Sequence, residues 1–98
     1  ALGREAGGPL EASLARARGV GDRRGEGRAL VELGFLDIHR GRAELARARI
    51  EAALAIAREL KDLTLQSDAQ NSLGNVEDFL GRPAQALVYY EAALTLAR

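Results

Sequence analysis

The sequence of 98 residues contains no cysteine, methionine or tryptophan, and only two prolines. The absence of cysteine excludes a disulfide framework and thiolate chemistry. No apolar run approaches the roughly 18–20 residues that a membrane span needs, and the opening stretch ALGREAGG lacks the charged and then apolar pattern of a signal peptide. The formal net charge is zero, which argues against a general nucleic-acid binder. We therefore expect a cytoplasmic protein without nucleic-acid or membrane partners.

The sequence does contain one phrase three times, with the copies forty residues apart. LEASLARARGVGD begins at Leu10, IEAALAIARELKD begins at Ile50, and YEAALTLAR begins at Tyr90. A Leu-Gly pair recurs between the copies with the same shift, ending at Gly34 and at Gly74. A fixed period of about 20–50 residues is typical of solenoids and other repeat arrays.

Each repeated unit is predicted to form two helices. The segments are rich in Ala, Leu, Glu and Arg, which favour helices, and no alternating apolar pattern is long enough for a sheet. Asp22 and Asp62 are suited to be helix N-caps. Gly41 and Gly81 are suited to end helices in a left-handed turn, and Pro83 is suited to the first turn of the next helix. Five helices are therefore expected, at roughly residues 9–19, 23–40, 43–60, 63–80 and 83–97.

Gly34 and Gly74 lie in the middle of two predicted helices, where glycine costs about 1 kcal/mol relative to alanine. Such a cost is usually offset by packing that leaves no room for a side chain. Small residues recur in the following helices at Ala46 and Ala86. We therefore expect each first helix to cross its partner closely, with glycine facing alanine.

The residues around the two Leu-Gly pairs resemble the tetratricopeptide repeat family. The resemblance rests on Leu33-Gly34 followed by Ala46, Ile50 and Ala53, and on Leu73-Gly74 followed by Ala86, Tyr90 and Ala93. The usual period of that family is 34 residues. The period of forty and the phrase SLGN resemble its longer-helix variety, which occurs in spindle-polarity adaptors and in bacterial signalling ATPases and transcription regulators. Asp37 and Glu77 depart from the family pattern, which often has an aromatic residue there.

The resemblance implies an all-α fold, a right-handed α-solenoid of antiparallel helix pairs. Residues 1–98 are then a single domain, with a partial repeat at about 1–22 and repeats at about 23–62 and 63–98. The chain would begin and end in mid-repeat, so we expect a fragment of a larger protein. The glycines before Pro9 would interrupt any helix in the opening residues.

Little in the sequence suggests catalysis. His39 is the only histidine, and a lone histidine at a helix end is interpreted as a surface or groove contact. Asp37 with Arg40, and Glu77 with Asp78, are interpreted as charged positions on helices rather than as paired catalytic carboxylates. The glycine-rich stretch GVGDRRGEG lacks the preceding strand of a phosphate-binding loop, so it is interpreted as an inter-repeat turn. We expect no catalytic residue, no cofactor and no metal site.

The resemblance also implies that the first helix of each repeat lines a concave groove, in which an extended or helical peptide lies. Helical spacing selects the side chains that would face this groove. In the first repeat they are Arg28, Val31, Glu32, Phe35 and His39, and in the second they are Asp68, Asn71, Ser72, Asn75 and Phe79. The amides of Asn71 and Asn75 offer a donor and an acceptor to a peptide backbone; alternatively they are solvated or locally bonded.

These inferences favour a scaffold that binds a peptide or partner segment of unknown identity. The alternative is a structural spacer or self-association segment of a multidomain bacterial regulator. A homodimer would then use apolar residues at the ends of the array: Leu10 and Leu14 at one end, and Leu87, Leu94 and Leu96 at the other. An enzyme is the third and least favoured class.

Overall fold

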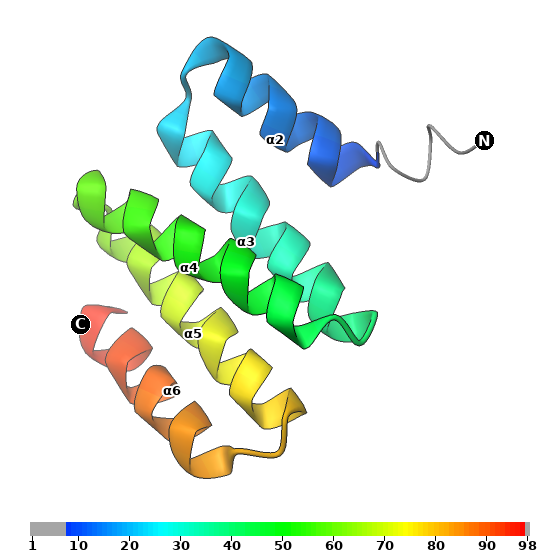
Figure 1. The fold of residues 1–98 in the computed structure, drawn as a ribbon. Helices are drawn as coiled ribbons and strands as arrows, with labels where there is room; N and C mark the ends of the chain where they lie inside the picture. Colours follow the sequence, from blue (N-terminus) through cyan, green and yellow to red (C-terminus); the bar gives the residue numbers. More distant parts are fainter. Residues whose placement is uncertain (1–7, 98) are drawn as a thin grey trace.

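The computed structural model describes residues 8–97, and these residues form five α-helices without a strand among them (Figure 1). The helices are α2 (Pro9–Val20), α3 (Arg23–His39), α4 (Ala43–Glu59), α5 (Leu63–Phe79) and α6 (Pro83–Ala97). Every predicted helix boundary agrees with the observed one to within one residue. The prediction for the opening residues lies outside the described residues, apart from Gly8, which is the N-cap of α2.

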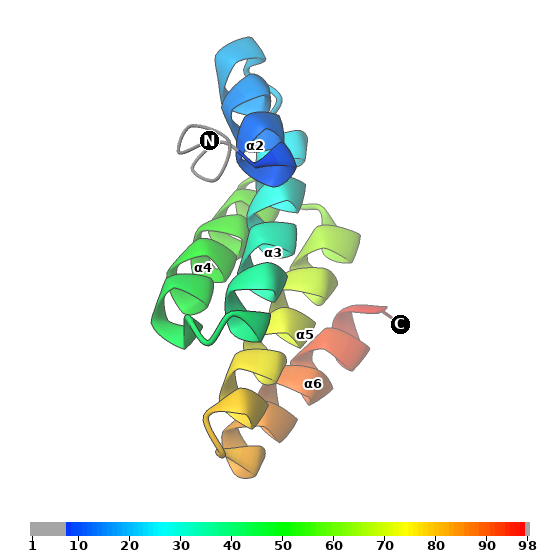
Figure 2. The same cartoon turned by 90° about the vertical axis from the view of Figure 1, so that its right-hand side faces the viewer.

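Consecutive helices run antiparallel and pack against each other, so the chain forms a helical array (Figures 1 and 2). The array is flat, with principal extents of 41 × 30 × 15 Å. α3 and α5, the first helices of successive pairs, contact each other directly, and α4 packs against both of them. This arrangement confirms the predicted all-α solenoid of antiparallel helix pairs.

The N-caps of α3 and α5 lie where the sequence predicts them. Asp22 Oδ1 accepts a hydrogen bond from the Gly25 N–H at 2.9 Å, and Asp62 Oδ1 accepts one from the Leu65 N–H at 3.0 Å. These bonds satisfy backbone N–H groups that have no partner within the helix. The Leu65 N–H, and then Arg24, lower the pKa of Asp62 because both favour its charged form. The cap of α5 therefore stabilises the fold above the ordinary carboxyl pKa and weakens on acidification.

Glycines end three helices in left-handed turns. The prediction is confirmed for Gly41 and Gly81, with φ of 75° and 74°, and Gly21 has a φ of 72°. The position forty residues after Gly21 is Lys61, which also has a positive φ, at 55°. A left-handed backbone is costly for a residue with a Cβ. The repeat therefore retains its turn geometry at Lys61 in spite of local strain.

The hydrophobic core lies on both sides of α4. One cluster joins Ile50 and Leu54 of α4 to Leu73 and Val76 of α5. A second cluster joins α4 to the inner faces of α2 and α3, where Leu33 is 1% exposed. α4 is therefore the central helix of the described chain, because its buried residues contribute to both clusters.

The mid-helix glycines Gly34 and Gly74 mark close helix crossings, but the side chains that face them are larger than the expected alanines. A Cβ built on Gly34 would lie 2.7 Å from Ile50 Cδ1, and one on Gly74 would lie 2.7 Å from Tyr90 Cδ1. The Ala46 carbonyl oxygen is also close, 3.4 Å from the Gly34 Cβ position. The isoleucine and the tyrosine, one turn beyond the alanines, are the nearest side chains to the two glycines.

Asp37 and Glu77 are buried, whereas the sequence indicated only charged positions on helices. Asp37 is 1% exposed and accepts a hydrogen bond from Arg49 at 2.7 Å. Glu77 is 3% exposed and accepts one from Arg47 at 2.6 Å. Both arginines belong to α4. Because a buried carboxylate is costly without a charged partner, each pair is needed for its helix to pack against α4.

Gly34→Ala is expected to destabilise the protein by about 1–3 kcal/mol, despite the higher helix propensity of alanine. The added methyl group would overlap the buried Ile50 side chain. The matched control is Gly19→Ala in α2, because apart from the chain neighbours and the backbone of the same helix nothing lies within 4 Å of the added Cβ there. This substitution is expected to stabilise the protein by up to about 1 kcal/mol. Urea unfolding followed by circular dichroism measures both changes. Equal effects of the two substitutions would contradict the close crossing.

Candidate functional site

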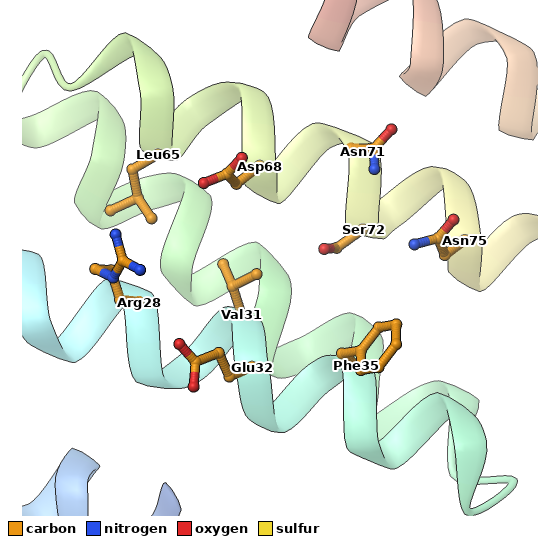
Figure 3. Close-up of a pocket in the computed structure, with 9 residues that line it drawn as sticks. All are labelled: Arg28, Val31, Glu32, Phe35, Leu65, Asp68, Asn71, Ser72 and Asn75. Atoms are coloured by element: carbon orange, nitrogen blue, oxygen red, sulfur yellow. The ribbon is translucent and has the colours of Figure 1, made fainter.

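An open cavity of about 340 Å³ lies between α3 and α5 (Figure 3). Figure 3 shows side chains from the two helices facing each other across it. The cavity is lined by Arg28, Val31, Glu32 and Phe35 of α3 and by Leu65, Asp68, Asn71, Ser72 and Asn75 of α5. Most of these side chains are charged or carry a hydrogen-bonding group, so the cavity suits a polar ligand group.

A second cavity of about 450 Å³ adjoins the first, because Phe35 and Asn75 line both. Phe35 and Phe79 are 49% and 53% exposed, and the centroid of the His39 ring lies 4.4 Å from that of Phe35 in an edge-on arrangement. Exposed aromatic surface is thus available to an apolar ligand group at this end. The remaining lining residues are Ile38 and Asp78.

We call the two cavities together the groove. Each of the ten side chains chosen by helical spacing lines it, and their role in binding stays a prediction. Three further residues, Leu65, Ile38 and Asp78, line the groove and were missed. Helical spacing could have found Leu65, because it lies three residues before Asp68. Ile38 and Asp78 occupy equivalent positions in the two forty-residue repeats, so the repeat could have found them as a pair.

The first cavity carries charges of both signs. Arg28, Glu32 and Asp68 line it, and all three are exposed. The other arginines of α3, Arg23 and Arg24, pair instead with acidic residues at the helix ends, at 2.8–2.9 Å and 2.6 Å. Arg28 is therefore the arginine of α3 whose guanidinium faces the groove.

Asn75 is tied to α6 by a hydrogen bond. The Tyr90 hydroxyl lies 2.8 Å from Asn75 Oδ1 and 2.7 Å from Asp78 Oδ2, and it can donate to either oxygen. A hydroxyl has a single proton, so the carboxylate of Asp78, the stronger acceptor, competes with Asn75 for it. Asn75 is locally bonded through its oxygen when the hydroxyl donates to it, and its NH₂ group can serve a ligand in either case.

Burial, and then the hydrogen bond to Asp78, raise the pKa of Tyr90 to about 12, above the ordinary value of about 10. The neutral hydroxyl therefore stabilises the folded state fully below about pH 10, and this contribution is lost as the pH rises through about 12.

We expect an alkaline titration of tyrosinate absorbance to show a step near pH 12 that is missing in Tyr90→Phe. An identical titration step in the variant would contradict this environment for Tyr90.

Within residues 8–97, no three His, Cys, Asp or Glu side chains are grouped closely enough to hold a metal ion. None of the five described helices is long and apolar enough to cross a membrane. The expectations of no cofactor and no catalytic residue stay predictions. The groove residues offer hydrogen bonds, charge pairing and apolar contact to a ligand.

Residues 25–98 match the family model of the tetratricopeptide repeat, a match that extends over α3, α4, α5 and α6. No curated protein and no solved structure matches the chain. Repeats of this kind generally mediate protein–protein interactions and are typically scaffolds rather than enzymes. Because the match covers well over half of the sequence and agrees with the observed helix pairs, the chain belongs to the tetratricopeptide repeat family.

Proposed function

We propose that this chain binds a peptide segment of a partner protein in the groove between α3 and α5. One observation carries the proposal: two helices at equivalent positions of successive repeats line two adjoining cavities with polar and aromatic side chains. Phe35 and Asn75, which occupy the same position in the two repeats, border both cavities. A ligand that lies along the groove would therefore contact both repeats at once.

The groove supplies different contacts along its length. Phe35 and Phe79 would remove exposed aromatic surface from water by packing against an apolar side chain of the ligand. Asn71 and Asn75 can pair with backbone groups of an extended segment whatever its sequence. Arg28 would hold an acidic group of the ligand through a charge-assisted hydrogen bond. This combination supports a peptide as the ligand.

The proposal extends to the organisation of the chain. Residues 1–98 form one domain, with repeats at about 23–62 and 63–98 and a partial repeat at about 1–22. The forty-residue spacing between the starts of α3 and α5 supports this division. We place the domain in a larger protein of the bacterial cytoplasm, such as a multidomain regulator.

Asn75→Ala is expected to weaken binding of a groove ligand by about 1–3 kcal/mol, because a buried peptide group would lose its hydrogen-bond partner. Arg28→Ala should weaken binding of ligands that carry an acidic group. Peptides selected from a random phage-displayed library against the immobilised chain serve as probes, and fluorescence anisotropy measures their affinity for each variant.

The matched control is Arg16→Ala, because Arg16 is exposed on α2 and does not line the groove. It should leave the affinity unchanged. Circular dichroism of each variant separates a loss of binding from a loss of folding. If Asn75→Ala and Arg28→Ala both bind the selected peptides normally, the groove is not the binding site.

Self-association is a second candidate function, favoured by one observation. α6 exposes large apolar side chains, with Leu87 56% and Leu94 57% exposed. At the other end of the array Leu14 is buried and Leu10 is half-buried, so α2 offers less apolar surface. A homodimer through α6 would appear in light scattering as a mass that rises with concentration and is reduced by Leu94→Glu. A constant monomer mass over the concentration series would exclude it.

A further inference from the structure

The second cavity of the groove has aromatic walls that come from both repeats. Phe35 and His39 of α3 and Phe79 of α5 line it, and the two phenylalanines are about half exposed. His39 packs edge-on against Phe35, with ring centroids 4.4 Å apart, and thereby restrains the Phe35 ring. Aromatic rings attract cations as well as apolar groups, because their π-electrons make each ring face negative. The cavity therefore suits a side chain that is apolar along its length and cationic at its end.

Asp78 gives this cavity a negative charge. Among the described residues that line it, Asp78 is the one with a formal charge when His39 is neutral. The arginines of the adjoining turns, Arg40 and Arg82, are not among these lining residues, and Arg82 Nη1 lies 3.5 Å from Glu77 Oε1. A cationic ligand group is therefore attracted to this cavity, and an acidic one is repelled.

The acceptor oxygens of Asn75 and Asp78 share a single hydrogen-bond donor. The Tyr90 hydroxyl reaches both Asn75 Oδ1 and Asp78 Oδ2, yet it has one proton to donate. Whichever oxygen accepts that proton, the other faces the hydroxyl oxygen without a hydrogen atom between them. In the free protein, water can supply the second donor. A ligand that covers the cavity must supply it instead, because an unpaired acceptor is costly once water is excluded.

We propose that the second cavity binds an arginine side chain of the peptide ligand. This proposal rests on the proposed function of the groove and specifies the ligand residue at one end of it. The aliphatic stem of the arginine covers Phe35 and Phe79, and its guanidinium donates hydrogen bonds to Asp78 and to Asn75 Oδ1. Figure 3 shows Arg28 at the opposite end of the first cavity from Phe35 and Asn75, so an acidic group of the ligand binds elsewhere in the groove.

Other side chains satisfy fewer of these conditions. An apolar side chain covers the rings but removes Asp78 from water without a charged partner. Lysine supplies the charge, but its ammonium is a compact and strongly hydrated group. A guanidinium is planar and more weakly hydrated, and it stacks on an aromatic ring while its fork of N–H groups serves two acceptors. Arginine is therefore preferred over lysine and over leucine.

Peptides selected from a random phage-displayed library against the immobilised 98-residue chain serve as probes. We expect the selected peptides to share an arginine. Replacing it by citrulline, which keeps the shape of the side chain but is neutral, should weaken the affinity at least about tenfold in fluorescence anisotropy. Replacement by lysine should cause a smaller loss, because the charge remains.

Asp78→Asn in the chain removes the charge and keeps the shape, so it should weaken binding of the arginine peptide by about tenfold. The citrulline peptide should be much less sensitive to Asp78→Asn, because its charge pair is already lost. Phe79→Leu should weaken binding of the arginine peptide by about two- to fivefold through loss of the cation–π contact. Glu51→Gln is the matched control, because Glu51 is an exposed carboxylate of α4 that does not line the groove, and it should leave the affinity unchanged.

The outcomes separate this proposal from the proposed function. If Asn75→Ala and Arg28→Ala weaken binding but the selected peptides share no arginine, or if Asp78→Asn affects both peptides equally, the groove binds peptides and the arginine proposal is wrong. Coupling of the arginine to Asp68→Asn instead would place it in the first cavity and would also overturn the proposal. If no peptide is selected, or if no groove substitution changes the affinity, both proposals are wrong. Asp78 and Phe79 are exposed, so both substitutions are compatible with the fold, which circular dichroism checks.

Discussion

The packing of α4 between its two neighbours is the constraint on which the rest of the structure depends. Residues two apart on an α-helix point about 200° apart, so Arg47 and Arg49 reach opposite neighbours. Arg49 pairs with Asp37 of α3, and Arg47 pairs with Glu77 of α5. Both carboxylates are buried. Because an unpaired buried charge is among the costliest defects in a protein interior, the two pairs hold α3 and α5 to the same central helix.

The same pairs explain how the chain accommodates its departure from the family pattern. Many repeats of this family have an aromatic residue at the position of Asp37 and Glu77, and its volume fills the space between helices. This chain has short carboxylates at that position. The arginine side chains that meet them are 25% and 22% exposed, so most of each aliphatic stem is removed from water. The pairing specifies which residues of neighbouring helices lie opposite each other.

The groove follows from this arrangement. α4 contacts both α3 and α5, which therefore lie side by side and line one pair of cavities. Asn75 is further restrained by Tyr90, whose ring covers Gly74 and whose hydroxyl reaches the amide. A helix outside the groove thus helps to position a side chain within it.

The sequence by itself determined the helices, their caps and the side chains that face the groove. These features depend on interactions within one helix turn, such as the Asp62 cap, or on helical spacing, as for Phe35. Only the tertiary structure decided that Glu77 is buried, that Arg47 is its partner, and that Tyr90 rather than Ala86 covers the nearest glycine. Those outcomes depend on how far each helix rotates and how closely it approaches its neighbour, which the summed packing of all helices determines and no local pattern records.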